Sequence, residues 1–328
     1  METYKDAAMR SQLHTRREQL VQAITQTGDN QQLVRLLQDV DAALERIDNG
    51  KLGICDVCHE PIEDRRLQVE PFATICLSHL SKEQQDAFER DLELASAIQR
   101  KLLPDKQERI DGWEVHYHYE PAGLVSGDYC DLIKPESKGR DAYILFGDVS
   151  GKGVAASLLM SRLHAIFRSL IISDLSFHQL VEKANKLFCD STLSAHFATL
   201  VSAKVSKDGD VEICNAGHCP PLLIRNGQVT SISSTGIPVG MFCDTRYELK
   251  NLNLNKGDTL LLYTDGLTET RNPSGEDYSE ERLTKFVADN HHLIPSALIS
   301  ACLADFNTFR SGASKVDDLT IMVLRRNG

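Results

Sequence analysis

The sequence predicts an α+β protein in which antiparallel sheets pack together with helices outside, preceded by smaller helical and zinc-binding segments. Three observations lead to this fold class: a paired Cys/His pattern within residues 55–79, strand-like apolar runs with hairpin turns beyond about residue 105, and amphipathic stretches between those runs. Hairpin turns favour antiparallel strand pairing, and amphipathic helices cover the outer faces of such sheets. With 328 residues, the chain is long enough for two domains.

Composition and charge argue against several functional classes. The chain is 41% hydrophobic and 25% charged, and its formal net charge is −11. This charge argues against a protein that binds nucleic acid mainly by electrostatic attraction. The polar, charged N-terminus predicts no secretory signal. We also expect no membrane span, because no stretch approaches the roughly 18 apolar residues that one requires.

The cysteines favour free thiols and a reducing, cytoplasmic environment. There are 9 of them, an odd number, and three belong to one metal-binding pattern. Disulfides are rare in reducing compartments, so isolated cysteines there are expected to remain unpaired. The other six are scattered singly: Cys130, Cys189, Cys214, Cys219, Cys243 and Cys302.

Residues 1–50 are predicted to form a helical hairpin. Apolar residues recur near helical spacing in two stretches, and Gly28-Asp29-Asn30 is the expected turn between them. The hairpin has little apolar surface, so we expect its faces to pack on each other and on a partner. The apolar positions are Leu13, Leu20 and Ile24 in the first helix and Leu33, Leu36, Leu37, Val40, Leu44 and Ile47 in the second.

Residues 51–82 are predicted to bind a structural zinc ion. Cys55 and Cys58 form one closely spaced pair, and Cys76 and His79 form another after 17 intervening residues. Two such pairs match tetrahedral zinc, and four protein ligands leave no open catalytic position. His59 is an alternative ligand, although its place beside Cys58 favours a surface position.

This segment resembles the DksA/TraR zinc finger. The resemblance rests on Gly50-Lys-Leu-Gly-Ile-Cys-Asp-Val-Cys58, Arg65-Arg66-Leu67 and Ala73-Thr-Ile-Cys76, and on the helical hairpin that precedes them. It implies binding to RNA polymerase through the secondary channel, with acidic residues at the hairpin tip. The chain departs from the family in having His79 instead of a fourth cysteine and only Asp29 at the tip. The finger is therefore also interpreted as a sensory or docking module.

Residues 83–104 are predicted to form a linker helix that ends before Pro104. Its apolar residues suggest one stripe, for which two interpretations stay open. The stripe could cover the core of the next domain, or it could pair with its twin in a homodimer. The residues of the stripe are Phe88, Leu92, Ala95, Ile98 and Leu102.

Residues 105–328 are predicted to form the domain of packed sheets. Asn226-Gly227 between two apolar runs is a strong hairpin signal. His116 and His118 share one face of an alternating stretch, where we interpret them as a pair on the face of a sheet. Helices are expected over four ranges: Val154–Ile172, Phe177–Leu193, Glu280–Asn290 and Pro295–Phe309.

Short acidic motifs beside apolar runs predict a metal site in this domain. A buried aspartate at a strand end is costly unless a positive group meets it. Several such ends converging would give the all-oxygen ligands that suit Mg²⁺ or Mn²⁺. The motifs are Ser126-Gly-Asp-Tyr-Cys-Asp131, Gly147-Asp-Val-Ser-Gly-Lys-Gly153, Tyr263-Thr-Asp-Gly266 and Asp317-Asp-Leu-Thr320.

Together with Glu93-Leu-Ala-Ser-Ala-Ile-Gln-Arg-Lys-Leu-Leu-Pro104 and Asn215-Ala-Gly-His218, these motifs resemble the SpoIIE/RsbU branch of the metal-dependent (PPM) protein phosphatases over roughly residues 95–326. The resemblance implies an α-β-β-α sandwich with two Mn²⁺ or Mg²⁺ ions at one end of its sheets. It also implies removal of phosphate from phosphoserine or phosphothreonine by a metal-activated water. The implied substrate is a phosphorylated STAS-type anti-sigma-factor antagonist, and an activating partner would act on the N-terminal half.

On this resemblance, four aspartates are the candidate catalytic residues. Asp148 is expected to bridge the two ions, and Asp265 and Asp317 would complete the ligands of one ion. The carbonyl of Val149 and, through water, Asp128 would serve the other.

Alternatives remain open at several positions. Asp131 could replace Asp128 as a ligand, and Asp318 could replace Asp317, although the family pattern puts the ligand first in the latter pair. Three further residues have secondary roles to consider: Gly151 in a tight turn, Lys152 as a phosphate contact or an exposed lysine, and His218 in holding a nearby loop.

Two other functions are weighed against the phosphatase. The first is a DksA/TraR-like regulator that binds RNA polymerase and carries a vestigial phosphatase domain. The second is a redox or zinc sensor whose finger thiolates lose metal on oxidation. The complete set of acidic motifs favours the phosphatase.

Overall fold

The computed structural model describes most of the chain, and its contacts divide the chain into two compact units. Unit 1 comprises Met1–Asp91 and unit 2 comprises Leu92–Gly328. The domain boundaries derived from the sequence remain predictions. The described residues are 10, 13–14, 17, 20–21, 31–63, 66–67, 70, 72–105, 107–134, 141–173, 175–190, 196–312 and 317–327.

Unit 1 contains helical segments that pack on each other. Helix α2 (Gln31–Asp48) follows a helical stretch whose described residues lie between positions 10 and 21. Arg17 binds Asp41 across the pair, with 2.6 Å between Nε and Oδ1. The predicted turn at residues 28–30, Ile24 and the side chains of Leu33 and Leu36 lie outside the described residues. The shared apolar cluster consists of Leu13, Leu20, Val40, Ala43, Leu44 and Ile47.

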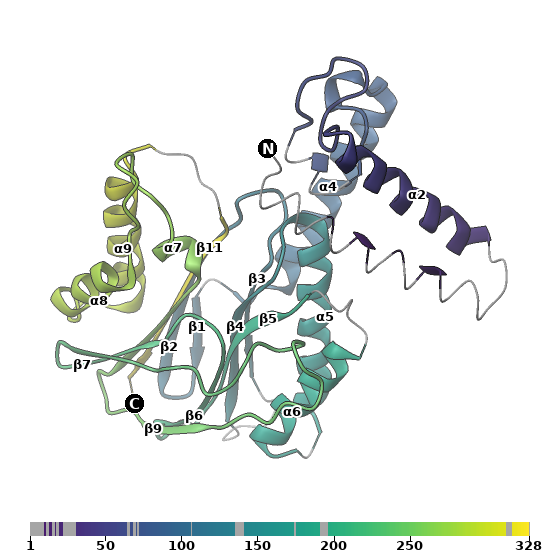
Figure 1. Cartoon of the computed structure of the whole chain (residues 1–328). Coiled ribbons are helices and arrows are strands. Elements are labelled where there is room, and N and C mark those ends of the chain that lie inside the picture. Colours follow the sequence, from purple (N-terminus) through teal and green to yellow (C-terminus); the bar gives the residue numbers. More distant parts are fainter. Residues whose placement is uncertain are drawn as a thin grey trace. The chain divides into compact units, whose positions relative to one another are not determined.

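Unit 2 contains two antiparallel sheets (Figure 1). The larger sheet has the order β1-β2-β11-β10-β7-β8, with strands Gln107–Ile110, Trp113–Glu120, Leu319–Arg326, Thr259–Tyr263, Leu222–Arg225 and Gln228–Ser231. The smaller sheet has the order β3-β4-β5-β6-β9, with strands Asp128–Ile133, Ala142–Val149, Ala198–Val205, Asp210–Ala216 and Lys250–Asn253.

Helices cover the outer face of each sheet, which gives the predicted α-β-β-α layers (Figure 1). Helices α5 (Gly153–Ile171) and α6 (Phe177–Cys189) pack on the five-stranded sheet. Helices α8 (Glu280–Asp289) and α9 (Pro295–Arg310) pack on the six-stranded sheet. Within the described residues, these four helices lie where the apolar periodicity predicted them.

Three apolar layers hold unit 2 together. Strand β4 illustrates the arrangement, because Ile144 and Phe146 face the other sheet while Leu145 faces the helices. Burial on both faces explains why Ala142–Phe146 reads as an unbroken apolar run rather than an alternating one. The sheets therefore form a rigid body whose strand ends can carry a site.

The linker helix differs from its predicted stripe. Helix α4 (Lys82–Leu102) buries Leu92, Ser96 and Gln99, whereas Ile98 is 54% exposed. The prediction that Ile98 shares a face with Leu92 is therefore wrong. The inward face includes Leu92 as predicted, but also two polar residues, and Gln99 meets polar backbone groups there, so apolar periodicity alone put Ile98 on the wrong face.

The expectation of free thiols is also wrong for two cysteines. Cys189 at the end of α6 is bonded to Cys243, across 54 residues of sequence. The Asn185 amide donates to the carbonyls of Phe242 and Cys243, at 2.9 and 3.1 Å, which fixes that segment beside α6. Only the folded chain brings the two cysteines together, and a cytoplasmic location remains a prediction.

Among the described residues, helix α5 alone is long and apolar enough, by length and composition, to span a membrane. From the sequence, no such stretch was expected. In the structure, Met160, Leu163 and Phe167 of this helix are buried in the apolar layer under the five-stranded sheet. Packing within unit 2 thus accounts for these three apolar residues, whereas Leu158 on the same helix is 65% exposed.

Candidate active site

The ends of paired strands bring the predicted acidic residues together. Asp128 begins β3 directly opposite Asp148 near the end of β4. Strand β10 runs into Asp265, the first residue of the short helix α7 (Asp265–Thr268), and Asp317 lies just before β11. Because β10 pairs with β11, these last two segments lie at one end of the six-stranded sheet.

Asp128 is buried and is held by hydroxyl groups from the other sheet. Only 1% of the residue is exposed to solvent. Thr264 Oγ1 donates to Asp128 Oδ2 at 3.2 Å, and Thr320 Oγ1 donates to the same oxygen. The Asp128 amide donates to Ser126 Oγ at 3.0 Å. Sequence reasoning missed both threonine roles, although each threonine lies within a quoted acidic motif.

The cluster concentrates negative charge in a desolvated place. Burial, together with the charges of Asp265, Asp318 and Asp317, raises the pKa of Asp148 to about 8. Burial and Asp148 raise the pKa of Asp128 well above its usual range, and burial and Asp317 raise that of Asp265. A divalent cation would relieve this repulsion, and the oxygen donors suit Mg²⁺ or Mn²⁺.

Asp317 and Asp318 have different surroundings. Asp318 accepts backbone hydrogen bonds on both oxygens, from Ala122 at 2.6 Å and from Gly127 at 3.0 Å. Asp317 instead pairs with the Lys152 ammonium at 2.9 Å, and both side chains are nearly half exposed. Both oxygens of Asp318 are occupied by fixed backbone amides, whereas the partner of Asp317 Oδ2 is a lysine side chain that is nearly half exposed and can turn away. This difference favours Asp317 over Asp318 as a ligand.

Asp131 lies apart from the cluster. It belongs to strand β3 rather than to a turn, and Arg168 of helix α5 binds both of its oxygens, at 2.7 and 2.9 Å. Side chains alternate across a strand, so Asp131 faces α5 while Asp128 faces the opposite sheet. Its observed partner is therefore an arginine, which argues against Asp131 as a metal ligand.

Glycines allow backbone segments to approach the carboxylates closely. A Cβ added at Gly127 would lie 2.8 Å from both Asp148 Oδ1 and the Val149 carbonyl oxygen. A Cβ at Gly266 would collide with the carbonyl oxygen of Asp318. Gly151 has φ +103°, a conformation that L side chains rarely adopt. The left-handed backbone at Gly151 forms the tight turn that was predicted beside Asp148.

His218 lies beneath the site rather than in it. Its Nδ1 is 2.8 Å from Thr199 Oγ1, and Thr199 pairs with Asp148 in the sheet. Its backbone amide donates to Asn215 Oδ1 at 2.8 Å. Burial lowers the pKa of His218 to about 4, so the ring is neutral near pH 7. These contacts agree with a role in holding the loop, as the sequence suggested.

The predicted zinc ligands form a group of donor atoms that could hold a metal ion. One donor atom from each of Cys55, Cys58, Cys76 and His79 lies within 4.8 Å of all the others. The Cys58 and Cys76 sulfurs are 3.8 Å apart, and Cys55 Sγ is 3.9 Å from His79 Nδ1. Zn–S bonds of about 2.3 Å give a tetrahedral edge of about 3.8 Å, so this group fits zinc.

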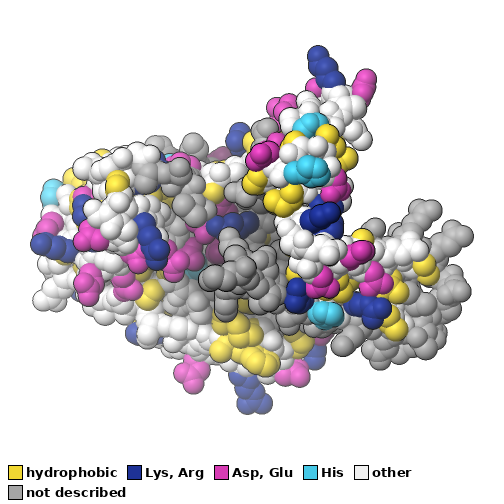
Figure 2. Space-filling view, turned by 45° about the horizontal axis from the view of Figure 1, so that its top comes forward, with side chains coloured by type: hydrophobic (Ala, Val, Ile, Leu, Met, Phe, Trp, Pro, Cys, Tyr) yellow, Lys and Arg dark blue, Asp and Glu magenta, His cyan; other side chains and the backbone are white. Residues whose placement is uncertain are grey.

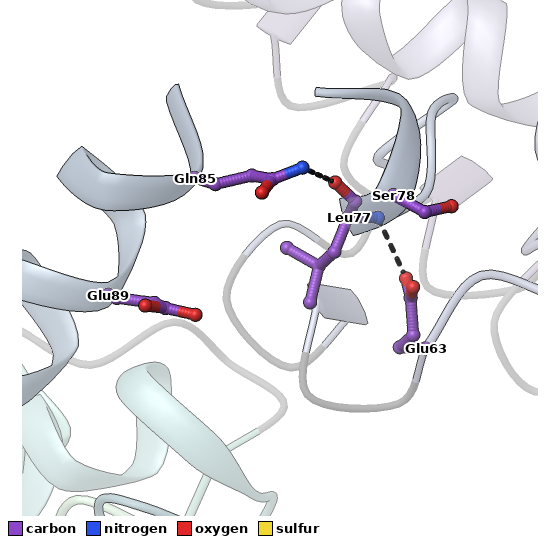
Figure 3. A pocket seen from close by; sticks show the side chains of 5 residues that line it. All are labelled: Glu63, Leu77, Ser78, Gln85 and Glu89. Atoms are coloured by element: carbon purple, nitrogen blue, oxygen red, sulfur yellow. Dashed lines mark hydrogen bonds between the residues drawn. The ribbon is translucent and has the colours of Figure 1, made fainter. Parts of the chain in front are cut away.

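A small pocket lies on unit 1 between the finger and the start of α4 (Figure 3). Gln85 donates to the Leu77 carbonyl at 2.6 Å, and the Leu77 amide donates to Glu63 at 2.9 Å. Its volume is about 230 Å³, below the roughly 300–1,000 Å³ of small-molecule sites. We therefore assign it no ligand.

Charged side chains on the visible surface are mixed rather than separated. On the face shown in Figure 2, Lys and Arg side chains of the described residues alternate with Asp and Glu.

The histidines at residues 116 and 118 bind the neighbouring glutamates Glu114 and Glu120, each at 3.1 Å, as expected for a pair on a sheet face.

Comparison with known proteins identifies relatives of both parts of the chain. Residues 138–327 match the family described as Stage II sporulation protein E (SpoIIE). Residues 50–78 match the prokaryotic dksA/traR C4-type zinc finger, and His79 lies immediately after that match. The finger resemblance is thereby confirmed, with histidine at the position after the matched range.

Two curated proteins and one solved structure illustrate the similarity. Protein IcfG of Synechocystis sp. is 27% identical over 76% of this chain, and the match spans 43% of IcfG. Phosphoserine phosphatase RsbU of Bacillus subtilis is 26% identical over 74% of this chain and 72% of RsbU. The structural match to the SiaA-PP2C domain of Pseudomonas aeruginosa covers 75% of this chain and 99% of that domain, with a TM-score of 0.64 and 19% sequence identity. The last likeness confirms the predicted fold.

Proposed function

The chain belongs to the SpoIIE family, and from this premise we propose that it is a metal-dependent serine/threonine protein phosphatase. The observation that carries the proposal is the cluster of Asp128, Asp148 and Asp265, whose pKa values are raised by burial and by neighbouring carboxylates. Such a cluster at the ends of two sheets suits a divalent cation and has no evident structural use.

The proposed ligands are divided between two Mn²⁺ or Mg²⁺ ions. Asp148 would be shared by both ions, Asp265 and Asp317 would hold one, and the Val149 carbonyl and Asp128, through water, would hold the other. When bound, the metals would supply an activated water and neutralise charge on the phosphoryl group. Thr264 and Thr320 keep Asp128 oriented by donating to its carboxylate.

Lys152 would assist with the phosphate. Its ammonium lies 2.9 Å from Asp317 Oδ2. Burial raises the pKa of Asp265, and the positive charge of Lys152 opposes this shift. Because its side chain is 47% exposed, it can turn from Asp317 toward a phosphoryl oxygen. Its positive charge would then complement the dianionic substrate.

The proposed substrate is a phosphoserine or phosphothreonine protein, specifically a STAS-type anti-sigma-factor antagonist. Support comes from the named activity of RsbU, a phosphoserine phosphatase.

We also propose a homodimer and an activating partner for unit 1. Leu94 and Ile98 on α4 are 61% and 54% exposed and lie four residues apart, which supports a dimer contact on this helix.

Unit 1 is proposed to hold one structural Zn²⁺. Cys55 and Cys76 are 0% and 4% exposed, whereas His79 lies at the surface. A closed set of three thiolates and one imidazole supports a structural role.

The test is phosphate release from a phosphoserine STAS-domain protein with Mn²⁺, comparing the native chain with Asp148→Asn and Asp265→Asn. Activity that requires metal and falls by at least 10²-fold in both variants is expected, by analogy with loss of electrostatic stabilisation of the transition state. Equal activity in the native chain and both variants would refute the assignment. A phosphoserine peptide from an unrelated protein separates general activity from preference for the STAS domain.

A further inference from the structure

The disulfide between Cys189 and Cys243 lies near the surface of unit 2 rather than in its core. Both cysteines are only partly buried, and Phe242 beside the bond is 64% exposed. Disulfides usually stabilise small domains whose cores are insufficient, whereas this sheet is packed with large side chains on both faces. Exposed disulfides are also the ones that are most readily reduced. The bond therefore suits a regulatory role better than a purely structural one.

The segment that carries the second cysteine, residues 239–243, is joined to strand β5 by its backbone. Val239 and Ala198 form an isolated bridge with two hydrogen bonds, at 2.7 and 2.8 Å. Gly240 packs against Phe188 of α6, where an added Cβ would lie 2.7 Å from a ring carbon. The 239–243 segment therefore contacts both the end of α6 and the start of β5.

The start of β5 supports a proposed metal ligand. Ala198 lies opposite Val149 in the sheet. Directly after this pair, the Ser150 amide donates to the Phe197 carbonyl at 2.8 Å, and the Phe197 amide donates to Ser150 Oγ at 2.9 Å. The Ser150 amide and the Val149 carbonyl belong to one planar peptide group. The hydrogen bond that holds this amide therefore also fixes the direction of the ligand oxygen.

A side chain of α6 holds the 239–243 segment independently of the disulfide. Asn185 is 0% exposed and accepts from the Gly240 amide at 2.8 Å. It also donates to the carbonyls of Phe242 and Cys243, at 2.9 and 3.1 Å. When the disulfide opens, the segment thus keeps these hydrogen bonds and loses its covalent tie. The consequence is a graded loosening rather than release.

We propose that Cys189 and Cys243 form a redox site that tunes metal binding. A dithiol reductant breaks the S–S bond by thiol–disulfide exchange: two electrons and two protons pass to the cysteines, which become thiols, and the reductant leaves as its own disulfide. In the oxidised chain, Val239 is held against Ala198 and the peptide group of the Val149 carbonyl keeps its orientation. In the reduced chain this support loosens, and the ion that the carbonyl serves binds more weakly. The inference rests on the proposed function for the identity of the metal site.

The test compares the oxidised and reduced native chain by Mn²⁺ affinity. The full-length, zinc-loaded chain is reduced with a trialkylphosphine, which has no thiol to compete for the finger zinc, and the phosphine is removed without air. Both forms are titrated with Mn²⁺ by calorimetry. We expect one Mn²⁺ dissociation constant to rise about tenfold on reduction, the lower end of the usual effect of groups that orient metal ligands.

A second readout needs no metal. Hydrogen exchange of the Val239 and Ala198 amides reports how firmly the 239–243 segment is held to β5. We expect both amides to exchange faster in the reduced chain than in the oxidised chain, with Mn²⁺ absent from both samples.

The Cys189→Ser/Cys243→Ser variant makes the open state permanent. Its Mn²⁺ affinity should equal that of the reduced native chain and should not respond to the phosphine, although every other cysteine is still present. Cys302→Ala is the matched control, because this thiol is free and buried in the other helical layer. It should respond to reduction as the native chain does. Should the double variant fail to fold, the reduced native chain supplies the comparison.

Three results would overturn the redox site while leaving the proposed function intact. They are equal Mn²⁺ affinity in the two native forms, a response to reduction that persists in the double variant, and equal hydrogen exchange at Val239 and Ala198 in both forms. An oxidised native chain that bound no Mn²⁺ would instead refute the two-metal site, and the redox control of it as well. A weaker affinity and faster exchange on reduction, both absent from the response of the double variant, would support the proposal.

Discussion

At the scale of single residues, close backbone approach matters as much as the carboxylates. Gly127 places its α-carbon where two proposed ligand oxygens leave no space for a side chain, and a Cβ at Gly266 would come closer still to the Asp318 carbonyl oxygen. A methyl group at either position must displace backbone or ligand atoms. These two glycines are therefore part of the site.

Replacing Gly127 with alanine is expected to abolish Mn²⁺ binding, because the new methyl group would push the Asp148 carboxylate and the Val149 carbonyl apart. Calorimetric titration with Mn²⁺ measures the loss. The control is Gly257→Ala, where φ is +92° and no atom lies within 4 Å of the added Cβ. That change strains the backbone by on the order of 1 kcal/mol and should lower the melting temperature with Mn²⁺ affinity unchanged. Undiminished binding in Gly127→Ala would contradict the close approach.

His218 leads to a prediction about acid stability. Its pKa is lowered by burial to about 4, against 6.5 for an ordinary histidine. Between these values the unfolded chain binds the proton and the folded chain does not, so stability is full above pH 6.5 and falls as the pH drops toward 4. In His218→Gln this contribution disappears. The slope of unfolding free energy against pH should then decrease by the amount that about one bound proton contributes. Urea unfolding across this range measures it, and parallel curves would show that His218 does not contribute.

At the scale of elements, the sequence predicted most helices and strands of unit 2 but not all their faces. Apolar periodicity located α5, α6, α8 and α9, because each packs an apolar face on a sheet. It could not identify the inward face of α4, where Gln99 is buried against polar backbone. Nor could it place Thr320 against Asp128, since the contact joins residues 192 positions apart on different sheets.

The disulfide between α6 and the segment at Cys243 should stabilise unit 2. Closing a loop of this size reduces the entropy of the unfolded chain, which typically contributes about 2–4 kcal/mol. We expect dithiothreitol to lower the free energy of unfolding by this amount in the native chain. The Cys189→Ser/Cys243→Ser double variant should have the lower stability with or without reductant. An identical unfolding curve for the native chain in both conditions would argue against the bond.

Helix α4 should mediate self-association through its exposed apolar residues. Leu94 and Ile98 are exposed, so Leu94→Asp/Ile98→Asp should reduce dimerisation in analytical ultracentrifugation and leave the melting temperature close to native. Leu92→Asp, by contrast, should unfold unit 2 because it buries a charge. A dimer unaffected by the double change would place the contact elsewhere.

At the scale of the whole molecule, the chain joins a zinc-finger unit to a SpoIIE-family unit. The resemblance of the ordered motifs to two known families implied this combination and the α-β-β-α layers. Two contacts could be seen only in the folded chain: the disulfide between Cys189 and Cys243, and the hydrogen bonds between Gln99 and Ser126. Both depend on contacts that no local pattern encodes.

The central claim is that the acidic cluster holds two divalent cations, and the most direct measurement is the stoichiometry of Mn²⁺ binding to the zinc-loaded chain. Electron paramagnetic resonance of free Mn²⁺ during a titration counts the bound ions. The account predicts two Mn²⁺ per native chain and loss of both in Asp148→Asn, since Asp148 is the proposed bridge. A native chain that binds no Mn²⁺, or an Asp148→Asn variant that still binds two, would contradict it.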